Sequence, residues 1–248
     1  MEPAATDPHE LELQAYNDWL LTKQIYHLKS RDFAPSFADL DIPKESARFF
    51  EVPPHSVPIQ ADVRTFDWPS LLNGVEQFEA IVMDPPWELT NGPPSRGVGL
   101  SYSTLTVKDI KNMPMGLLQK NGLLFVWVIN STYDTALELF EHWGYRIIGD
   151  ICYSKQTNSR HLARGHGYYL QHAKETCLVG VKGTLDPAMF RSQVCSDFFE
   201  APRTGQSQKP PSLYEMIEAA IPQGRFLEIF ARRTNLRDFW LSIGNEIA

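Results

Sequence analysis

Short apolar runs alternate with stretches of helical periodicity from residue 59 onward, and this alternation constrains the fold more than any other feature of the chain. The apolar runs span residues 80–83, 123–128, 146–153, 177–181 and 226–230, and the helical stretches lie near 106–118, 132–143, 211–221 and 235–242. Runs that are apolar on both faces and separated by helices are typical of a mostly parallel sheet covered on both sides. The pattern predicts an α/β, doubly wound sandwich, in which ligands bind beyond the carboxyl ends of the strands.

The N-terminal part of the chain follows a different pattern. Residues 10–28 carry apolar side chains at roughly the helical period, which predicts an amphipathic helix after a short tail. Five prolines between residues 35 and 58 then break any long element. The sequence therefore predicts an N-terminal tail and helix over residues 1–45, suited to docking a partner, and a main domain over residues 46–248.

Charge and cysteine content narrow the classes of function. Thirty acidic residues against 23 basic ones give a net charge of -7, the wrong sign for a protein that holds nucleic acid by phosphate neutralisation alone. Cys152, Cys177 and Cys195 stand far apart, so neither a disulfide framework nor a zinc site is expected, and no metal is predicted. The longest apolar stretch, residues 122–129, is too short to span a membrane, and the acidic N-terminus has no signal-peptide core. We expect a soluble nuclear or cytoplasmic protein that is not secreted.

A carboxylate, two prolines and an indole follow the first long apolar run: Asp84, Pro85, Pro86 and Trp87. The prolines fix φ and lack N–H groups, so they make a stiff turn whose carbonyl groups are free to accept hydrogen bonds. A planar amine held by the Asp84 carboxylate and the Pro85 carbonyl would keep its lone pair directed at an electrophile. Trp87 offers a face on which a base can stack. The motif indicates a clamp for an exocyclic amine, and a strand-ending turn with a core aromatic is the structural alternative.

With further segments ordered around this motif, the chain resembles the MT-A70 family of S-adenosylmethionine-dependent adenine N(6)-methyltransferases, which carry a DPPW motif. The likeness runs from about residue 59 to residue 247, and its segments are residues 60–64, 84–87, 102–105, 121–128, 143–145, 172–183, 209–218, 227–235 and 240–245. The resemblance implies a Rossmann-like methyltransferase sandwich in permuted order, with the catalytic motif before the cofactor strand. In agreement with that order, no G-x-G-x-x-G loop stands upstream of Asp84.

The resemblance also implies roles for individual residues. Catalysis is assigned to Asp84, Pro85, Pro86 and Trp87. Contact with S-adenosylmethionine is assigned to Asp62, Val63, Asp84, Lys174, Phe230, Arg232, Asn235, Asn245 and Glu246, with Lys174 meeting the methionine carboxylate. Contact with the substrate is also expected from Tyr102, which lies in a matching segment. Residue composition adds Arg96, in a loop over residues 88–100 whose three glycines suggest a lid, and Arg164 and His166, in the most basic stretch of the domain.

Simpler structural interpretations compete at several of these positions. Lys174 can be an ordinary surface lysine, Asn235 a helix cap, and Asn245 a turn residue. The basic loop that holds Arg164 and His166 is equally well explained as a solvated turn.

The leading hypothesis is methyl transfer from S-adenosylmethionine to the N(6) amine of an unstacked adenine in DNA or RNA, by direct in-line attack. Two alternatives stay open: a non-catalytic scaffold or nucleic-acid-binding subunit, and a methyltransferase that acts on another planar amine. Family members often work as heterodimers with a degenerate paralogue, and such a partner would supply the basic surface that this acidic chain lacks. We therefore expect the chain to be the catalytic subunit of a heteromeric complex and to bind nucleic acid weakly on its own.

Overall fold

The computed structural model describes residues 52–72, 77–88, 104–157, 159–165, 170–185, 195–202 and 208–247. The strands are β1 (Val57–Gln60), β2 (Ala80–Met83), β3 (Gly122–Val128), β4 (Arg146–Gln156), β5 (Lys174–Lys182), β6 (Phe198–Pro202), β7 (Phe226–Ile229) and β8 (Trp240–Gly244). The helices are α2 (Trp68–Leu71), α3 (Val107–Lys111), α4 (Met115–Leu118), α5 (Tyr133–His142) and α6 (Pro211–Ala220), with short 3₁₀ turns at η2 (Asn130–Thr132) and η4 (Arg233–Asn235). The predicted N-terminal extension over residues 1–45 lies outside the described residues.

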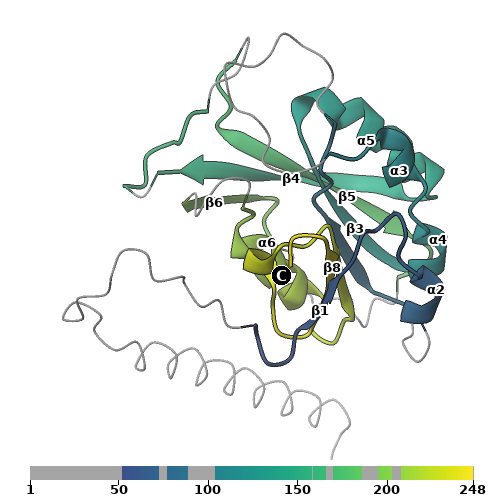
Figure 1. Cartoon of the computed structure of the whole chain (residues 1–248). Coiled ribbons are helices and arrows are strands. Elements are labelled where there is room, and N and C mark those ends of the chain that lie inside the picture. Colours follow the sequence, from purple (N-terminus) through teal and green to yellow (C-terminus); the bar gives the residue numbers. More distant parts are fainter. Residues whose placement is uncertain are drawn as a thin grey trace, which may run out of the picture. The chain divides into compact units, whose positions relative to one another are not determined.

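The eight described strands form one sheet in the order β1-β8-β7-β2-β3-β5-β4-β6 (Figure 1). Five neighbouring pairs are parallel, and β5 alone runs antiparallel to its two neighbours, β3 and β4. The mostly parallel sheet predicted from the apolar runs is confirmed. The chain enters the centre of the sheet at β2 and returns to β2's other neighbour, β7, only near its C-terminus, which is the permuted order.

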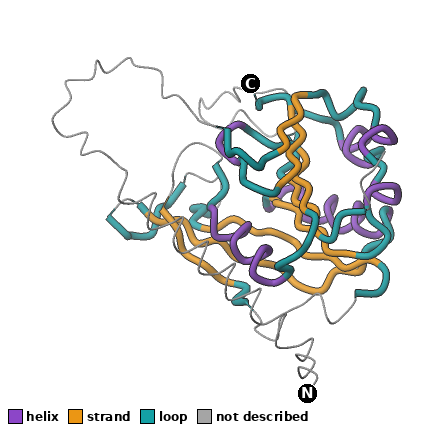
Figure 2. Tube along the Cα trace, turned by 90° about the horizontal axis from the view of Figure 1, so that it is seen from below, coloured by secondary structure: helices purple, strands orange, loops and turns teal. Residues whose placement is uncertain are grey.

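Helices cover both faces of the sheet, and Figure 2 shows them on either side of the strands. One core cluster packs residues of α3, α4 and α5 against inward-facing residues of β2 and β3 such as Ile81 and Leu124. The opposite cluster packs α6 against Val82, Phe125 and Trp127. Successive side chains of a strand point to opposite faces, and both faces are covered here. Every residue of β2 and β3 is therefore buried, in agreement with their continuous apolar runs.

The predicted helices agree with the structure except in two places. The stretch near 106–118 is two short helices, because Pro114 separates α3 from α4. The helix predicted near 235–242 is wrong: this segment leaves η4 and becomes strand β8, which lies between β1 and β7 and pairs in parallel with both. Pairing on both sides outweighs the local helical pattern there. Strands β1 and β6, at the two edges of the sheet, were not among the predicted elements.

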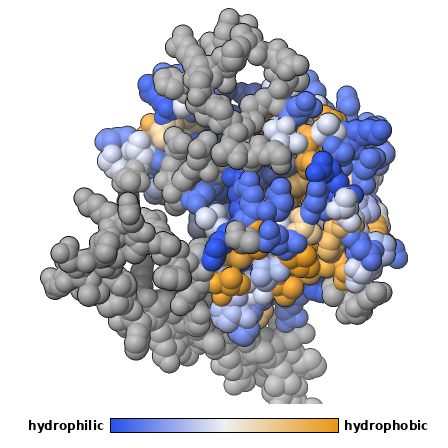
Figure 3. Space-filling model, viewed as in Figure 1, coloured by the Kyte–Doolittle hydropathy of each residue, from blue (hydrophilic) through white to orange (hydrophobic). Residues whose placement is uncertain are grey.

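The surface carries apolar side chains near one edge of the sheet. Hydrophobic residues show over β1 in Figure 3. Exposed large apolar side chains of the described residues include Val57 of β1 and Phe239 just before β8. Among these residues, no helix is both long enough and apolar enough to cross a membrane.

Candidate active site

The motif residues lie where the topology changes direction. Strand β2 lies between β3 and β7 and is parallel to both, so the carboxyl ends of the three strands meet at one edge of the sheet. Asp84 directly follows β2, Ile129 follows β3, and Phe230 follows β7. Such an edge is where ligands bind in open α/β sheets, as the sequence predicted.

The two prolines form a turn that is fixed by backbone hydrogen bonds. The Pro85 carbonyl accepts from the Trp87 N–H at 2.8 Å, and the Pro86 carbonyl accepts from the Leu105 N–H at 2.9 Å. The expectation that both carbonyls are free is therefore wrong, although a carbonyl oxygen keeps a second lone pair for another donor. Trp87 is buried, and its indole N–H donates to the Trp127 carbonyl at 3.0 Å, which ties the motif to the end of β3.

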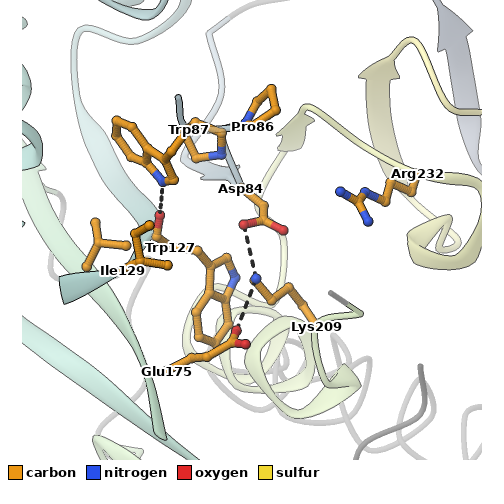
Figure 4. A pocket seen from close by; sticks show the side chains of 10 residues that line it. Asp84, Pro86, Trp87, Trp127, Ile129, Glu175, Lys209 and Arg232 are labelled. Atoms are coloured by element: carbon orange, nitrogen blue, oxygen red, sulfur yellow. Dashed lines mark hydrogen bonds and ion pairs between the residues drawn. The ribbon is translucent and has the colours of Figure 1, made fainter. Parts of the chain in front are cut away.

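A pocket opens at this edge (Figure 4). Its lining joins the four motif residues to the end of β3, the start of β5, the segment before α6 and the segment after β7. The lining residues are Asp84, Pro85, Pro86, Trp87, Trp127, Val128, Ile129, Glu175, Lys209 and Arg232.

A buried lysine bridges two carboxylates in this pocket. Lys209 Nζ lies 3.0 Å from Asp84 Oδ1 and 3.0 Å from Glu175 Oε2. The exposed fractions of these side chains are 8% for Lys209, 17% for Asp84 and 19% for Glu175. Glu175 also forms an ion pair with Lys155 of β4. Two carboxylates and two ammonium groups therefore alternate in a line that starts at Asp84.

Burial and the neighbouring charges shift these groups in different directions. Burial raises the pKa of the Asp84 carboxyl above its usual value, and the Lys209 ammonium limits that rise. Burial would also raise the pKa of Glu175, but Lys209 and Lys155 outweigh it and hold this pKa below its usual value. Burial disfavours a charged lysine, but Asp84 and Glu175 hold the pKa of Lys209 above its usual value. Lys209 is therefore charged at neutral pH and favours the ionised form of both carboxylates.

Three pocket residues, Lys209, Glu175 and Trp127, were not among the site residues predicted from the sequence. Lys209 was noted only as part of a segment that resembles the family. A lysine by itself does not indicate a site residue. Glu175 adjoins the predicted Lys174 on β5, and consecutive strand residues point to opposite faces. Lys174 is exposed and donates from Nζ to Thr176 Oγ1 at 3.1 Å, and it is not among the residues that line the pocket.

The predicted cofactor residues after β7 lie around the pocket's other side. Arg232 lines the pocket, and its Nε lies 3.3 Å from Glu246 Oε2. Phe230 has a φ of 68°, a left-handed conformation that is strained for a residue with a side chain. Asn245 is exposed next to Glu246. The segment after β7 and the segment after β8 thus meet beside the pocket.

Asn235 takes part in a buried polar cluster with Tyr214 and Glu228. Its Nδ2 donates to Glu228 Oε1 at 3.0 Å, and the Tyr214 hydroxyl donates to the same oxygen at 2.7 Å. Burial raises the pKa of Glu228 to about 7, although these two hydrogen bonds oppose the rise. Glu228 Oε2 is buried and has no hydrogen-bond partner among the described residues.

Asp62, Val63 and Arg164, which the structure describes, are not among the residues that line the pocket. Asp62, after β1, accepts hydrogen bonds from the backbone and guanidinium of Arg64, and Val63 is buried with its carbonyl accepting from Trp68 Nε1. Arg164 is exposed. Arg96, Tyr102 and His166 lie outside the described residues, so their expected contacts with the substrate stay predictions.

The chain is similar to known proteins over most of its length. A family model described as MT-A70 matches residues 78–246. The chain is 34% identical over 191 residues to the "Probable N(6)-adenosine-methyltransferase MT-A70-like" of Oryza sativa subsp. japonica. It is 32% identical over 191 residues to the "N(6)-adenosine-methyltransferase catalytic subunit METTL3" of Homo sapiens, and each of the two alignments covers 76% of the chain.

A more distant relative carries a different description. The chain is 28% identical over 198 residues to the "N(6)-adenosine-methyltransferase non-catalytic subunit METTL14" of Xenopus laevis, with 75% of the chain covered. The alignments span 25% of the rice protein, 31% of the human protein and 42% of the Xenopus protein. The chain thus matches less than half the length of each of these relatives.

Proposed function

The chain belongs to the MT-A70 family, and from this premise we propose that it transfers a methyl group from S-adenosylmethionine to the N(6) amine of adenine in nucleic acid. The observation that carries the proposal is the largely buried Asp84 carboxylate at the end of β2, held 3.0 Å from Lys209 in a pocket lined by two tryptophans. A carboxylate beside apolar aromatic walls suits an amine on a flat ring. The higher identity to relatives described as methyltransferases than to the one described as non-catalytic also supports a catalytic role.

The residues of the pocket fit the chemistry of S-adenosylmethionine. Its amino-acid end carries a carboxylate, and two cationic side chains, Lys209 and Arg232, line the pocket. Its ribose and adenine need polar partners, and Asn245 and Glu246 follow β8 next to Arg232. Because Lys209 is already paired with Asp84 and Glu175, we propose that Arg232 takes the role predicted for Lys174, contact with the methionine carboxylate. When bound, S-adenosylmethionine would supply a methyl group on a sulfonium, whose sulfur leaves as a neutral thioether when the methyl group is transferred.

The chain's own contribution is position and charge. Asp84 accepts a hydrogen bond from the target amine, and the second lone pair of the Pro85 carbonyl accepts the other, so the nitrogen lone pair is left free. As the amine attacks, positive charge develops on nitrogen, and the fixed Asp84 carboxylate stabilises that charge. Trp87 and its partner Trp127 hold the turn rigid, which keeps the carboxylate in place.

The pocket accepts a base only after the base has left its stack, so single-stranded or flipped adenine in DNA or RNA is the proposed substrate. The net charge of -7 favours a partner that supplies basic surface. The similarity to both a METTL3 and a METTL14 subunit supports a heterodimer with a paralogous subunit. We also propose a nuclear or cytoplasmic location.

Transfer of a labelled methyl group to matched DNA and RNA oligonucleotides tests the proposal. The full chain is assayed alone and together with the subunits that copurify with it. We expect N(6)-methyladenine in the product and a loss of about 100- to 1000-fold in kcat for Asp84→Asn. Asp150→Asn, on an exposed carboxylate of β4 outside the pocket, is the matched control. Methylation of another amine, or an Asp84→Asn variant with full activity, would refute the assignment.

A further inference from the structure

One indole in the pocket has no hydrogen-bond partner in the part of the chain that the structure describes. Five tryptophans lie in the described residues, and four of them donate their indole N–H: Trp68 to Val63 O, Trp87 to Trp127 O, Trp143 to Lys111 O and Trp240 to Glu218 Oε1. Trp127 is 2% exposed, and its Nε1 has no partner among the described residues. A buried, unpaired N–H costs about 1–3 kcal/mol, so such a group points to an acceptor that arrives with a ligand.

The unpaired group lies in the wall of the pocket that holds Asp84. Trp127 comes from the end of β3, and Figure 4 shows its indole beside the Asp84, Glu175 and Lys209 side chains. Lys209 Nζ lies 5.1 Å from the centroid of the Trp127 ring. The wall therefore contains a hydrogen-bond acceptor, Asp84, and a buried hydrogen-bond donor, the Trp127 indole, close to each other.

The charges around Trp127 favour a neutral acceptor. Asp84 and Glu175 are matched by Lys209 and Lys155 through the ion pairs of the pocket. A neutral ring nitrogen can accept from the indole without disturbing this balance, whereas an anion there would approach two carboxylates. A donor next to a neutral acceptor is the pattern of the Watson–Crick edge of adenine, where the N(6) amine adjoins ring nitrogen N1.

We infer that the Trp127 indole N–H donates to N1 of the target adenine while Asp84 holds the N(6) amine. This assignment rests on the proposed function and adds a base-contacting residue to it. Trp127 contacts the ring nitrogen, and an adenine analogue that lacks this acceptor beside the amine is disfavoured because it leaves the N–H unpaired. The reading uses the Watson–Crick edge, as expected for a base taken out of its stack.

Deaza-substituted substrates test the contact directly. Three oligonucleotides are compared that carry adenine, 1-deazaadenine or 7-deazaadenine at the target position, so that each keeps the exocyclic amine. The enzyme is the full chain with its copurifying subunits, and kcat/KM for methyl transfer is measured. We expect the wild-type enzyme to lose about tenfold on 1-deazaadenine and less on 7-deazaadenine, which is the scale of one hydrogen bond in a buried site.

Trp127→Phe removes the N–H and keeps an aromatic ring, which separates the contact from the altered basicity of the deaza ring. We expect this variant to lose about tenfold on adenine and little further on 1-deazaadenine, because both changes remove the same hydrogen bond. Trp143→Phe is the matched control, since its indole donates to Lys111 O at 3.1 Å outside the pocket. Relative to the wild type, the control should lower kcat/KM on adenine and on 1-deazaadenine by the same factor.

Several outcomes would overturn the assignment. One is that Trp127→Phe lowers kcat/KM relative to the wild type by the same factor on adenine and on 1-deazaadenine. Another is that the wild-type enzyme loses more on 7-deazaadenine than on 1-deazaadenine. A third is weaker binding of S-adenosylmethionine by Trp127→Phe with unchanged selectivity, which would assign the N–H to the methyl donor. If Trp127→Phe does not fold, the wild-type comparison of the deaza substrates decides. Wild-type enzyme that methylates no adenine would refute the proposed function as well, so the two failures are distinguishable.

Discussion

Lys209 Nζ lies 3.0 Å from Asp84 Oδ1, although most of the domain's sequence separates the two residues. The same ammonium lies 3.0 Å from Glu175 Oε2, so two carboxylates share one buried cation. The charge on Asp84 therefore depends on both neighbours: Lys209 favours the ionised form, and Glu175 opposes it. Because a carboxylate stabilises a developing positive charge only when it is ionised, this arrangement sets the pH range of the proposed reaction.

Removing the cation should shift activity toward alkaline pH. Lys209→Met deletes the ammonium and keeps most of the apolar stem, so the pKa of Asp84 loses the neighbour that limits its rise. We expect the acid limb of the pH profile of kcat/KM to move to higher pH. Carbon NMR titration of labelled aspartate follows Asp84 without requiring activity. Lys108→Met, on an exposed lysine of α3, is the control, and an unmoved Asp84 titration in folded Lys209→Met would contradict the coupling.

Removing the second carboxylate should shift the same titration in the opposite direction. The Glu175 charge raises the pKa of Asp84, so Glu175→Gln should lower this pKa and move the acid limb to lower pH. Lys209 also loses one of the two anions that hold its own pKa up. The measurement is the same aspartate titration. Shifts of the same sign in Lys209→Met and Glu175→Gln would show that the three groups do not form one coupled set.

Much of the fold follows from sequence pattern alone because β2, β3 and β7 are buried on both faces. Their apolar runs have one stable environment, a sheet covered by helices on both sides. The segment at residues 235–242 could not be predicted in the same way. Its strand β8 depends on hydrogen bonds to β1 and β7, and β1 lies about 180 residues upstream. A local stretch of sequence does not show pairing between segments so far apart.

The site residues that lie within one short motif could be predicted from the sequence. Those brought together from different strands could not. Asp84 to Trp87 is contiguous, so its residue types indicate an amine clamp directly. The cation beside Asp84 arrives from the segment before α6, and Glu175 differs from Lys174 only by the side of the strand on which it lies. Which of two neighbouring residues enters a pocket is set by strand register, and register is fixed by pairing with β3 and β4.

The buried Glu228 should make stability depend on pH. Its pKa is about 7 in the folded protein, above the ordinary value of 4.5, so between these values the folded state holds a proton that the unfolded chain has lost. The stabilisation is therefore complete below about pH 4.5 and is lost as the pH rises through about 7. The loss amounts to at most roughly 3–4 kcal/mol, from about 1.4 kcal/mol per pH unit.

Glu228→Gln replaces the titrating carboxyl with a neutral group of similar shape. We expect the free energy of unfolding of the wild-type chain, measured with urea, to fall relative to that of the variant between about pH 5 and pH 8. Glu138→Gln, on an exposed carboxylate of α5, should leave the wild-type slope unchanged. Parallel pH dependences of the wild type and Glu228→Gln would mean that Glu228 stays ionised in the fold.

The segments that follow β7 and β8 approach each other closely because Gly244 has no side chain. A Cβ at this position would lie 2.0 Å from the Ala231 carbonyl oxygen and 2.9 Å from the Ala231 nitrogen. Both are backbone atoms, so the two segments would have to separate. The neighbouring contacts that join them are the hydrogen bond from the Arg233 N–H to the Glu246 carbonyl and the ion pair between Arg232 and Glu246.

Gly244→Ala should therefore weaken cofactor binding as well as the fold. We expect a loss of about 1–3 kcal/mol in stability from overpacking, and a weaker affinity for S-adenosylmethionine because Arg232 moves with its segment. Thermal unfolding and calorimetric titration with the cofactor measure the two effects. Gly149→Ala is the matched control, since a Cβ on this strand glycine meets no atom within 4 Å. If Gly244→Ala binds the cofactor as tightly as Gly149→Ala, the close approach of the two segments does not shape the cofactor site.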